Sequence, residues 1–313
     1  MNEVAITGFG SYLPRLMHTN ETLPPLDTPL DAQEIARIGV YRRGWAGDGE
    51  GIAEMAAIAA QRALERAGME AQTLDLIILA NWTQRRYIPE FAPRLKQLLG
   101  ARRAFAYDVC CACAGFIYGL GMAHSFLQNP RYARALVVAS ETTAQRARPG
   151  SKAMLILGDA AGAFVLERAA GHGGRLIDYE LATDGEHHAI MDISPQGYVR
   201  THIPQRELNA LASRSIAGVV EHLLVRNRLT LAEIDWIVPH SGTAGVQAMI
   251  AQTLAVPREK ILTNFATIGN VSSASIPTVL DEFVAAGRIR PGDLILSAAV
   301  GTGWYAAAML YTV

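Results

Sequence analysis

The stretch Tyr107-Asp-Val-Cys-Cys-Ala-Cys-Ala-Gly-Phe116 decides the fold of this chain. A β-like run over residues 104–109 leads into it, and an apolar helical pattern follows over residues 117–127. This order predicts a strand, a tight turn and a buried helix, with Cys113 at the helix start. There the helix dipole and nearby backbone N–H groups would favour a thiolate. The alternative is that all three cysteines are small buried hydrophobic residues, the usual situation of a free cysteine.

Bulk composition limits the class of protein. The 313 residues are 50% hydrophobic and 18% charged, which suffices for a large core in one domain or in two fused halves. A net charge of −1 argues against partners recruited by charge, such as nucleic acid or an anionic membrane. No apolar run reaches membrane-spanning length, and the N-terminus lacks the features of a signal peptide. We therefore expect a soluble, cytoplasmic protein.

The cysteine count also excludes two kinds of site. The chain has three cysteines, and all of them lie within the quoted stretch. They are too close together for a disulfide framework or for the usual ligand spacing of a zinc site. We expect no metal centre.

Helical and strand patterns alternate along the chain. Expected helices cover residues 52–67, 89–99, 117–127, 208–224, 246–254 and 278–286. Expected strands cover residues 4–10, 74–80, 104–109, 134–140, 234–240, 261–265 and 304–311, with a turn between strand-like runs at 155–166 and a strand and glycine turn at 293–303. Residues 11–50 are expected to form a surface loop with short helical pieces, and residues 184–205 a second loop. Continuous apolar strands of this kind are typical of buried parallel sheets.

A weak internal repeat divides the chain. Leu74-Asp-Leu-Ile-Ile78 and Ile234-Asp-Trp-Ile-Val238 each follow a helical pattern. Aligning their aspartates places the region of Cys113 opposite the region of Asn270. The pattern predicts two stacked α/β halves, residues 1–168 and 169–313. Generic α/β patterning is the alternative explanation.

Four further motifs follow the cysteine stretch: Gly158-Asp-Ala-Ala-Gly-Ala163, Val238-Pro-His240, Gly269-Asn-Val-Ser-Ser-Ala-Ser-Ile-Pro277 and the turn at Gly301. In this order, and over nearly the whole length, the chain resembles the thiolase superfamily, most closely its β-ketoacyl-acyl-carrier-protein synthase III branch. The resemblance implies a five-layered αβαβα thiolase-like fold built from two pseudo-repeated halves. It also implies a homodimer.

The resemblance assigns the nucleophile to the third cysteine. Cys113 matches the family's acyl-accepting cysteine, which attacks a thioester and holds the acyl group covalently. Cys110 and Cys111 are left as packing residues.

The same resemblance assigns the second half of the site. His240 and Asn270 match the pair that stabilises the enolate oxygen formed when a malonyl thioester loses CO₂. The backbone N–H groups of Cys113 and Gly301 match the oxyanion hole. Each residue also has a structural alternative: a packed core histidine, a turn asparagine and an ordinary glycine turn.

Substrate-recognition positions depart from the family pattern. Thr243 stands where members have an asparagine that contacts the pantetheine arm. Gln33 stands where many have a tryptophan that stacks on the coenzyme A adenine, and Trp45 is a candidate to replace that stack. Lys152 and Arg148 are candidates for the arginine on the other side of the adenine. These departures weaken the case for a standard fatty-acid initiation enzyme.

Residues 84–88, Gln-Arg-Arg-Tyr-Ile, match the loop that crosses the family's dimer interface and shapes the partner's acyl pocket. The position makes Ile88 a candidate pocket residue. We hypothesise that Arg85 or Arg86 meets a carboxylate or another polar acyl group there. The alternative is that both arginines are solvated or paired at the interface.

The function implied is an acyltransferase of the ketosynthase type, in fatty acid or polyketide biosynthesis. An acyl group would pass to Cys113 and then undergo decarboxylative Claisen condensation with a malonyl-type thioester, giving a β-ketoacyl product. Coenzyme A or phosphopantetheine thioesters and an acyl carrier protein are the expected substrates and partner, with no permanently bound cofactor. Two alternatives stay open: acyl transfer without decarboxylation, and a non-catalytic partner subunit of a ketosynthase.

Overall fold

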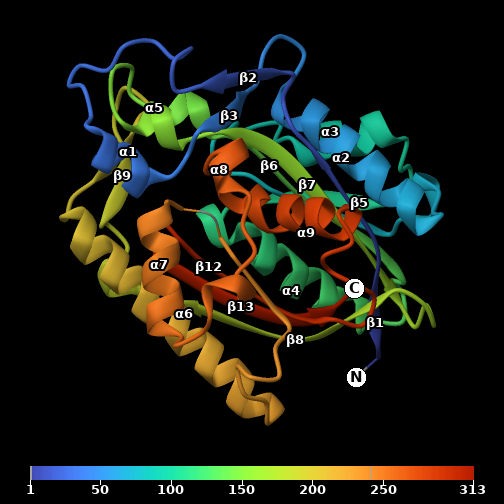
Figure 1. Cartoon of the computed structure of the whole chain (residues 1–313). Coiled ribbons are helices and arrows are strands. Elements are labelled where there is room, and N and C mark those ends of the chain that lie inside the picture. Colours follow the sequence, from blue (N-terminus) through green and yellow to red (C-terminus); the bar gives the residue numbers. More distant parts are fainter. Residues whose placement is uncertain (1, 241) are drawn as a thin grey trace.

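A mixed nine-stranded sheet organises the computed structural model of the chain, which describes residues 2–240 and 242–313 (Figure 1). Its strand order is β11-β12-β13-β8-β1-β7-β6-β4-β5. The strands are β1 (Val4–Tyr12), β4 (Leu76–Ala80), β5 (Phe105–Val109), β6 (Arg134–Thr142), β7 (Asp159–Arg168), β8 (Gly174–Thr183), β11 (Trp236–Pro239), β12 (Leu294–Gly301) and β13 (Tyr305–Thr312).

Helices cover the sheet in three layers. They are α1 (Ala32–Ile38), α2 (Ile52–Ala67), α3 (Ala92–Leu99), α4 (Gly115–Leu127), α5 (Ala153–Ile156), α6 (Gln205–Asn227), α7 (Ala244–Thr253), α8 (Phe265–Ile268) and α9 (Ser275–Ala285). The middle layer is α4 and α9, which contact strands of both halves (Figure 1). α2 packs on β1, β6 and β7, while α6 packs on β8, β12 and β13. The predicted αβαβα layering is therefore confirmed.

The middle helix α4 is apolar on most of its surface because strands from both halves of the sheet pack against it. Phe116, Ile117 and Leu120 are each 0% exposed. The outer helix α2 has a buried alanine-rich face, which allows close approach to the sheet. The sequence pattern after the cysteines thus places α4 at the centre of the molecule.

The two halves share one strand arrangement. β4 runs parallel to β6, β6 antiparallel to β7, and β7 antiparallel to β1. β11, β12, β13 and β8 repeat this sequence of directions. The aspartates that the repeat aligned make equivalent contacts: Asp75 Oδ2 accepts the amide of Arg134 (3.1 Å), and Asp235 Oδ2 accepts that of Leu294 (2.8 Å). The division of the chain at residue 168 itself stays a prediction.

Two expectations about secondary structure are wrong. Residues 261–265 form a single bridge from Ile261 to Ile237 and then enter α8, so they make no full strand. The segment 155–166 begins in the short helix α5 rather than in a strand. In both places an apolar run fits either a strand or a buried helix, and tertiary packing decides between them.

Two expected loops contain regular structure. Residues 11–50 form the hairpin of β2 (Leu16–Thr19) and β3 (Arg42–Trp45), with α1 between its strands. Residues 184–205 contain a second hairpin, β9 (Met191–Ile193) with β10 (Val199–Thr201). Such short strands are set by pairing with each other, which leaves little periodic signal in the sequence.

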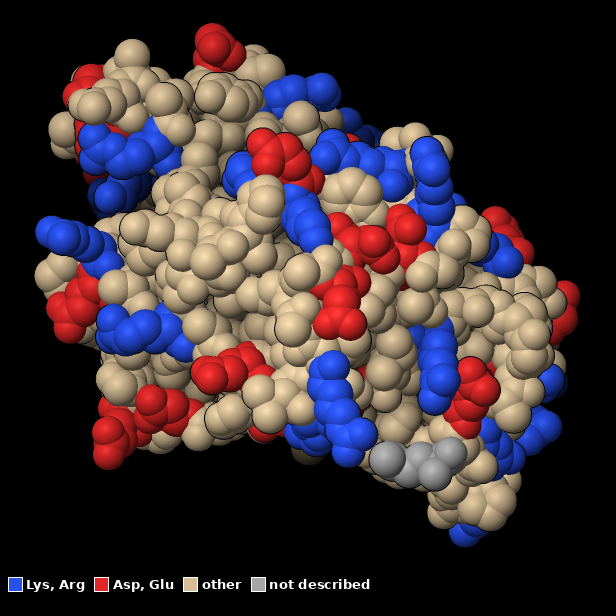
Figure 2. Space-filling view, turned by 60° about the horizontal axis from the view of Figure 1, so that its bottom comes forward, with Lys and Arg blue, Asp and Glu red and all other residues tan. Residues whose placement is uncertain are grey.

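The surface carries charges of both signs. On the face shown in Figure 2, Lys and Arg side chains lie interspersed with Asp and Glu, in keeping with totals of 28 and 29 for the chain. Within the two described ranges, none of the helices is both long and apolar enough to span a bilayer.

Candidate active site

Functional side chains gather where parallel strands end. Cys113 follows β5, His240 follows β11 directly, and Gly301 is the last residue of β12. Carboxyl ends of parallel strands share one sheet edge, where α/β proteins commonly bind ligands. With Asn270, these residues line one cavity of about 750 Å³. The structure thus brings all four predicted chemical groups together.

Cys113 lies in a tight turn, the short 3₁₀ helix η2 (Ala112–Ala114), directly before α4. The preceding Ala112 has a φ of 45°, a left-handed conformation that is strained for alanine. The Cys113 sulfur accepts a hydrogen bond from the Ser272 hydroxyl at 3.3 Å. The turn therefore lets Cys113 line the cavity while α4 continues into the core.

The protonation of Cys113 differs from the expectation based on the helix start. Burial raises the pKa of its thiol to about 12, with a smaller effect in the same direction from Glu141. The Ser272 hydroxyl acts against this by donating to the sulfur. Burial therefore opposes ionisation of the thiol, and the helix start does not by itself make a thiolate.

The other two cysteines lie elsewhere. Cys110 is exposed, and Cys111 is buried in the core. Burial raises the pKa of the Cys111 thiol to about 11. Of the three, Cys113 is the one that lines the cavity.

His240 is held by backbone contacts on two sides. The backbone N–H of His240 donates to Ala298 O at 2.7 Å, and the ring Nδ1 lies 3.2 Å from Ser272 O. A carbonyl can only accept, so this contact selects the tautomer with its proton on Nδ1. Burial lowers the pKa of His240 to about 4. The ring is therefore neutral near pH 7, and its Nε2 carries the lone pair.

Asn270 is fixed by its backbone and by one side-chain oxygen. Its N–H donates to Ile156 O at 2.7 Å, and its carbonyl accepts from Gly158 N at 3.1 Å. Its Oδ1 accepts from Ser272 N at 3.0 Å. Over the described ranges Nδ2 has no hydrogen-bond partner, so this amide nitrogen remains available as a donor in the cavity.

Gly301 touches the cysteine turn. A Cβ at this position would lie 2.5 Å from Cys111 O and 2.9 Å from Cys113 N. Only glycine allows the end of β12 to approach the Cys113 amide this closely. The end of β12 thus lies against the Cys113 amide, and an oxyanion hole formed by these two backbone N–H groups stays a prediction.

Three of the predicted substrate-binding residues line the cavity: Thr243, Lys152 and Arg148. Thr243 also caps α7, where its hydroxyl accepts the Val246 amide at 3.4 Å. Arg148 is paired with Asp27 at 2.7 Å.

The loop of residues 84–88 does not line the cavity of its own chain. Arg85 pairs with Glu90 at 3.1 Å, and the Arg86 guanidinium lies over the Phe91 ring at 4.8 Å. Ile88 is 93% exposed. Within one chain the arginines contact Glu90 and Phe91, and a role across a dimer interface stays a prediction.

The two predicted adenine-stacking positions are not part of this cavity either. The Trp45 ring lies 4.5 Å from the His18 ring, and its Nε1 donates to Leu157 O at 3.4 Å. The hairpin β2–β3 holds the indole in this position. Gln33 lies on the exposed first turn of α1.

The sequence analysis missed a buried polar group close to Cys113. Trp82 and Thr83 follow β4, and Glu141 lies near the end of β6. Glu141 is 0% exposed, and its pKa is raised to about 7 by burial. Position after neighbouring parallel strands was the signal that could have identified these residues. Ser272, inside a motif quoted above, was missed as well.

The hairpin β9–β10 was also missed. Met191, Tyr198 and Val199 line the cavity. Arg146 holds the hairpin by donating from Nη1 to Gly197 O at 3.0 Å. The strands are too short to give a periodic sequence pattern, so this part of the cavity wall could not be predicted.

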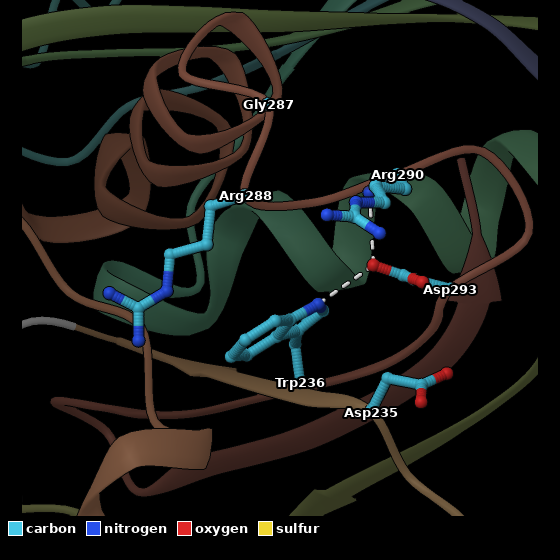
Figure 3. A pocket seen from close by; sticks show the side chains of 6 residues that line it. All are labelled: Asp235, Trp236, Gly287, Arg288, Arg290 and Asp293. Atoms are coloured by element: carbon cyan, nitrogen blue, oxygen red, sulfur yellow. Dashed lines mark hydrogen bonds between the residues drawn. The ribbon is translucent and has the colours of Figure 1, made fainter.

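A second, shallower pocket of about 380 Å³ lies at the opposite end of β11 (Figure 3). There Trp236 Nε1 and the Arg290 amide both donate to Asp293, at 2.8 and 2.9 Å. The Arg288 guanidinium lies over the Trp236 ring at 5.2 Å. These contacts join the start of β11 to the segment that precedes β12. The described residues contain no cluster of three His, Cys, Asp or Glu side chains suited to a metal.

The fold and the Cys–His–Asn cavity define a condensing enzyme of the thiolase-like class. The family model "3-Oxoacyl-[acyl-carrier-protein (ACP)] synthase III" matches residues 107–185, and the model of its C-terminal part matches residues 224–313. β-Ketoacyl-[acyl-carrier-protein] synthase III of Hyphomonas neptunium is 35% identical over 98% of both chains. The chain belongs to the 3-oxoacyl-[acyl-carrier-protein] synthase III family.

Solved structures agree with this membership. The 3-oxoacyl-[acyl-carrier-protein] synthase III of Aquifex aeolicus VF5 has a TM-score of 0.92 and 32% identity, covering 99% of this chain and 100% of that chain. The priming β-ketosynthase of the R1128 polyketide pathway has a TM-score of 0.91 and 24% identity, covering 100% and 96%. At that identity it shares the fold alone.

Proposed function

We propose that this chain catalyses acyl transfer to Cys113 followed by decarboxylative condensation with a malonyl-type thioester. The observation that carries the proposal is the convergence of Cys113, His240 and Asn270 on one cavity, with Gly301 against the Cys113 amide. Membership of the synthase III family supports the same reaction. Retention of Asn270 favours condensation over simple acyl transfer, which has less need of an enolate site.

In the first step the Cys113 sulfur attacks the acyl thioester carbonyl. The new bond is S–C, the thiol of coenzyme A leaves, and the proton of Cys113 passes to that leaving thiol. Negative charge develops on the acyl oxygen, where the backbone N–H groups of Cys113 and Gly301 would donate to it. One such donor commonly contributes about 10²–10³-fold in rate.

In the second step the malonyl thioester loses CO₂ and leaves an enolate, whose carbon attacks the acyl group on Cys113. Asn270 Nδ2 is positioned as one donor to the enolate oxygen. His240 donates from Nε2 only when both ring nitrogens carry protons, since Nδ1 already holds one. An incoming malonyl carboxylate favours that imidazolium. The step consumes one proton, which His240 would take up from solvent as the carboxylate binds and then pass to the Cys113 thiolate that leaves the acyl group.

Coenzyme A and carrier-protein thioesters are the proposed substrates. Lys152 and Arg148 place cationic groups on the cavity wall, where phosphate groups would be attracted. Thr243 lies on the same wall and is the proposed pantetheine contact.

We also propose a homodimer. Tyr87 is 100% exposed and Ile88 is 93% exposed, and adjacent apolar side chains of this size commonly mark an interface. In a dimer this loop would bring Arg85 and Arg86 toward the partner's acyl site. An acyl-donor panel tests that role: a preference for dicarboxylic over acetyl thioesters should disappear in Arg85→Ala and Arg86→Ala.

Intact-mass spectrometry after incubation with acyl thioesters tests the function. We expect a mass gain that Cys113→Ala removes, and release of CO₂ when a malonyl thioester is added. A mass gain without CO₂ release would indicate acyl transfer alone. No gain with any donor would favour the non-catalytic partner subunit.

A further inference from the structure

A chain of two hydrogen-bond donors ends at the nucleophile. Trp82 Nε1 donates to Ser272 Oγ at 2.6 Å, and Ser272 Oγ donates to Cys113 Sγ at 3.3 Å. The three residues come from three places in the sequence: the end of β4, the turn before α9 and the turn before α4.

The chemistry of the groups fixes the direction of this chain. An indole N–H can only donate, while a hydroxyl has one hydrogen and two lone pairs. Because Trp82 occupies a lone pair of Ser272 Oγ, the Ser272 hydrogen is free to point elsewhere. The sulfur of Cys113 receives it. Donors in series polarise one another, which strengthens the last bond.

Ser272 is held rigidly enough to aim its hydroxyl. It is 1% exposed, and its φ of 53° is a strained left-handed conformation. Its N–H donates to Asn270 Oδ1 at 3.0 Å, and its carbonyl accepts from Ser275 Oγ at 2.6 Å. The same carbonyl contacts His240 Nδ1 at 3.2 Å. One residue thus touches all three proposed catalytic side chains.

Trp82 is anchored in turn by the buried carboxylate. Its backbone N–H lies 3.3 Å from Glu141 Oε2, which also accepts from Thr83 Oγ1 at 2.9 Å. Glu141 Oε1 accepts from Ser273 Oγ at 2.5 Å. The carboxylate therefore joins the loop that carries the indole to the turn that carries Ser272.

We propose that Trp82 and Ser272 are positioning residues that hold the Cys113 sulfur as a hydrogen-bond acceptor and favour its thiolate form. Burial opposes ionisation of this thiol. A hydrogen-bond donor aimed at the sulfur stabilises the thiolate, which the helix start alone does not do sufficiently. The inference rests on the proposed function for its catalytic benefit, although the hydrogen bonds themselves are independent of it.

The test is the rate of Cys113 alkylation by iodoacetamide across about pH 6–9, followed by peptide mass spectrometry, since the rate follows the thiolate fraction. Ser272→Ala should lower the rate about tenfold or more at each pH, the loss expected for one hydrogen bond to a charged group. Trp82→Phe should lower it less, because Ser272 keeps its hydroxyl. Acyl loading should slow in parallel in both variants.

Trp236→Phe is the matched control. It removes an indole N–H bond of 2.8 Å to Asp293, in the pocket of Figure 3 away from the cavity. Its alkylation profile should equal that of the unaltered chain. Unchanged profiles in folded Ser272→Ala and Trp82→Phe, or an equal loss in Trp236→Phe, would overturn the inference. If the unaltered chain takes no acyl group at all, the proposed function fails. The alkylation comparison still tests whether Trp82 and Ser272 favour the Cys113 thiolate.

Discussion

Two turns of the molecule have the same backbone design and different chemistry. In the first half, Ala112 with a φ of 45° opens a 3₁₀ turn before α4. In the second half, Ser272 with a φ of 53° opens the 3₁₀ turn η6 (Ser272–Ala274) before α9. The internal repeat, which aligns Asp75 with Asp235, places these two turns at corresponding positions. The two halves therefore use the same backbone arrangement here.

The two turns differ in their side chains. The residue after Ala112 is Cys113, whose sulfur lies in the cavity. The residue after Ser272 is Ser273, whose hydroxyl donates to the buried Glu141. One turn presents the proposed nucleophile, and the other holds its surroundings in place. In the proposed mechanism the repeated backbone divides the reaction: the first half would bind the acyl group, and the second would supply His240, Asn270 and Ser272.

The strongest test of this division removes the thiol. Cys113→Ala should abolish the acyl adduct and all condensation, because no other group in the turn can replace the sulfur. Cys110→Ala is the matched control, since Cys110 is exposed and outside the cavity lining, and it should retain the adduct. Intact mass measures both. Retention of the adduct in Cys113→Ala would show that the first turn has been misassigned.

The next largest effect is expected where the halves touch. Gly301→Ala places a Cβ 2.9 Å from Cys113 N, which should displace the oxyanion donors and slow acyl loading by about 10²-fold or more. Gly218→Ala is the control, because nothing lies within 4 Å of a Cβ there and alanine suits a helix interior better. Single-turnover loading rates compare the two. Equal rates would contradict the proposed oxyanion hole.

The smallest effect concerns the buried Glu141, which joins the second turn to the loop after β4. Burial raises the pKa of Glu141 from an ordinary 4.5 to about 7, so the folded state holds its proton over a pH range in which the unfolded chain has lost it. Folding stability should therefore fall as pH rises from about 4.5 through 7. Glu141→Gln stays neutral and should lose this part of the slope. Urea unfolding at several pH values measures it, and an unchanged slope would mean that Glu141 is not the group responsible.

The sequence predicted α2 over residues 52–67, the strand before the cysteines and the repeat of Asp75 with Asp235, because each depends on local periodicity or on a fixed spacing. It also predicted that Cys113, His240 and Asn270 belong to one site, because their motifs match the family in order, and all three line one cavity. The Trp82–Ser272 contact joins residues 190 positions apart. No local pattern encodes such a contact, and tautomer choice and thiol protonation depend on burial that only the folded chain defines.

The position of Trp45 shows a further limit of sequence reasoning. A tryptophan near the expected binding region was a candidate for adenine stacking. The hairpin β2–β3 instead turns the indole toward His18 and Leu157. Pairing of β2 with β3 decides the direction of that side chain, so the residue type alone could not predict it.

The measurement that tests the division of labour most directly is the fate of the acyl adduct in Asn270→Ala and His240→Ala. Each variant is first incubated with an acyl thioester and then given a malonyl thioester, and the adduct mass on Cys113 is followed. The account predicts that both variants form the adduct and then keep it, with condensation reduced about 10²-fold or more. Failure to form the adduct in either variant would contradict the assignment of loading to the first turn and condensation to the second half.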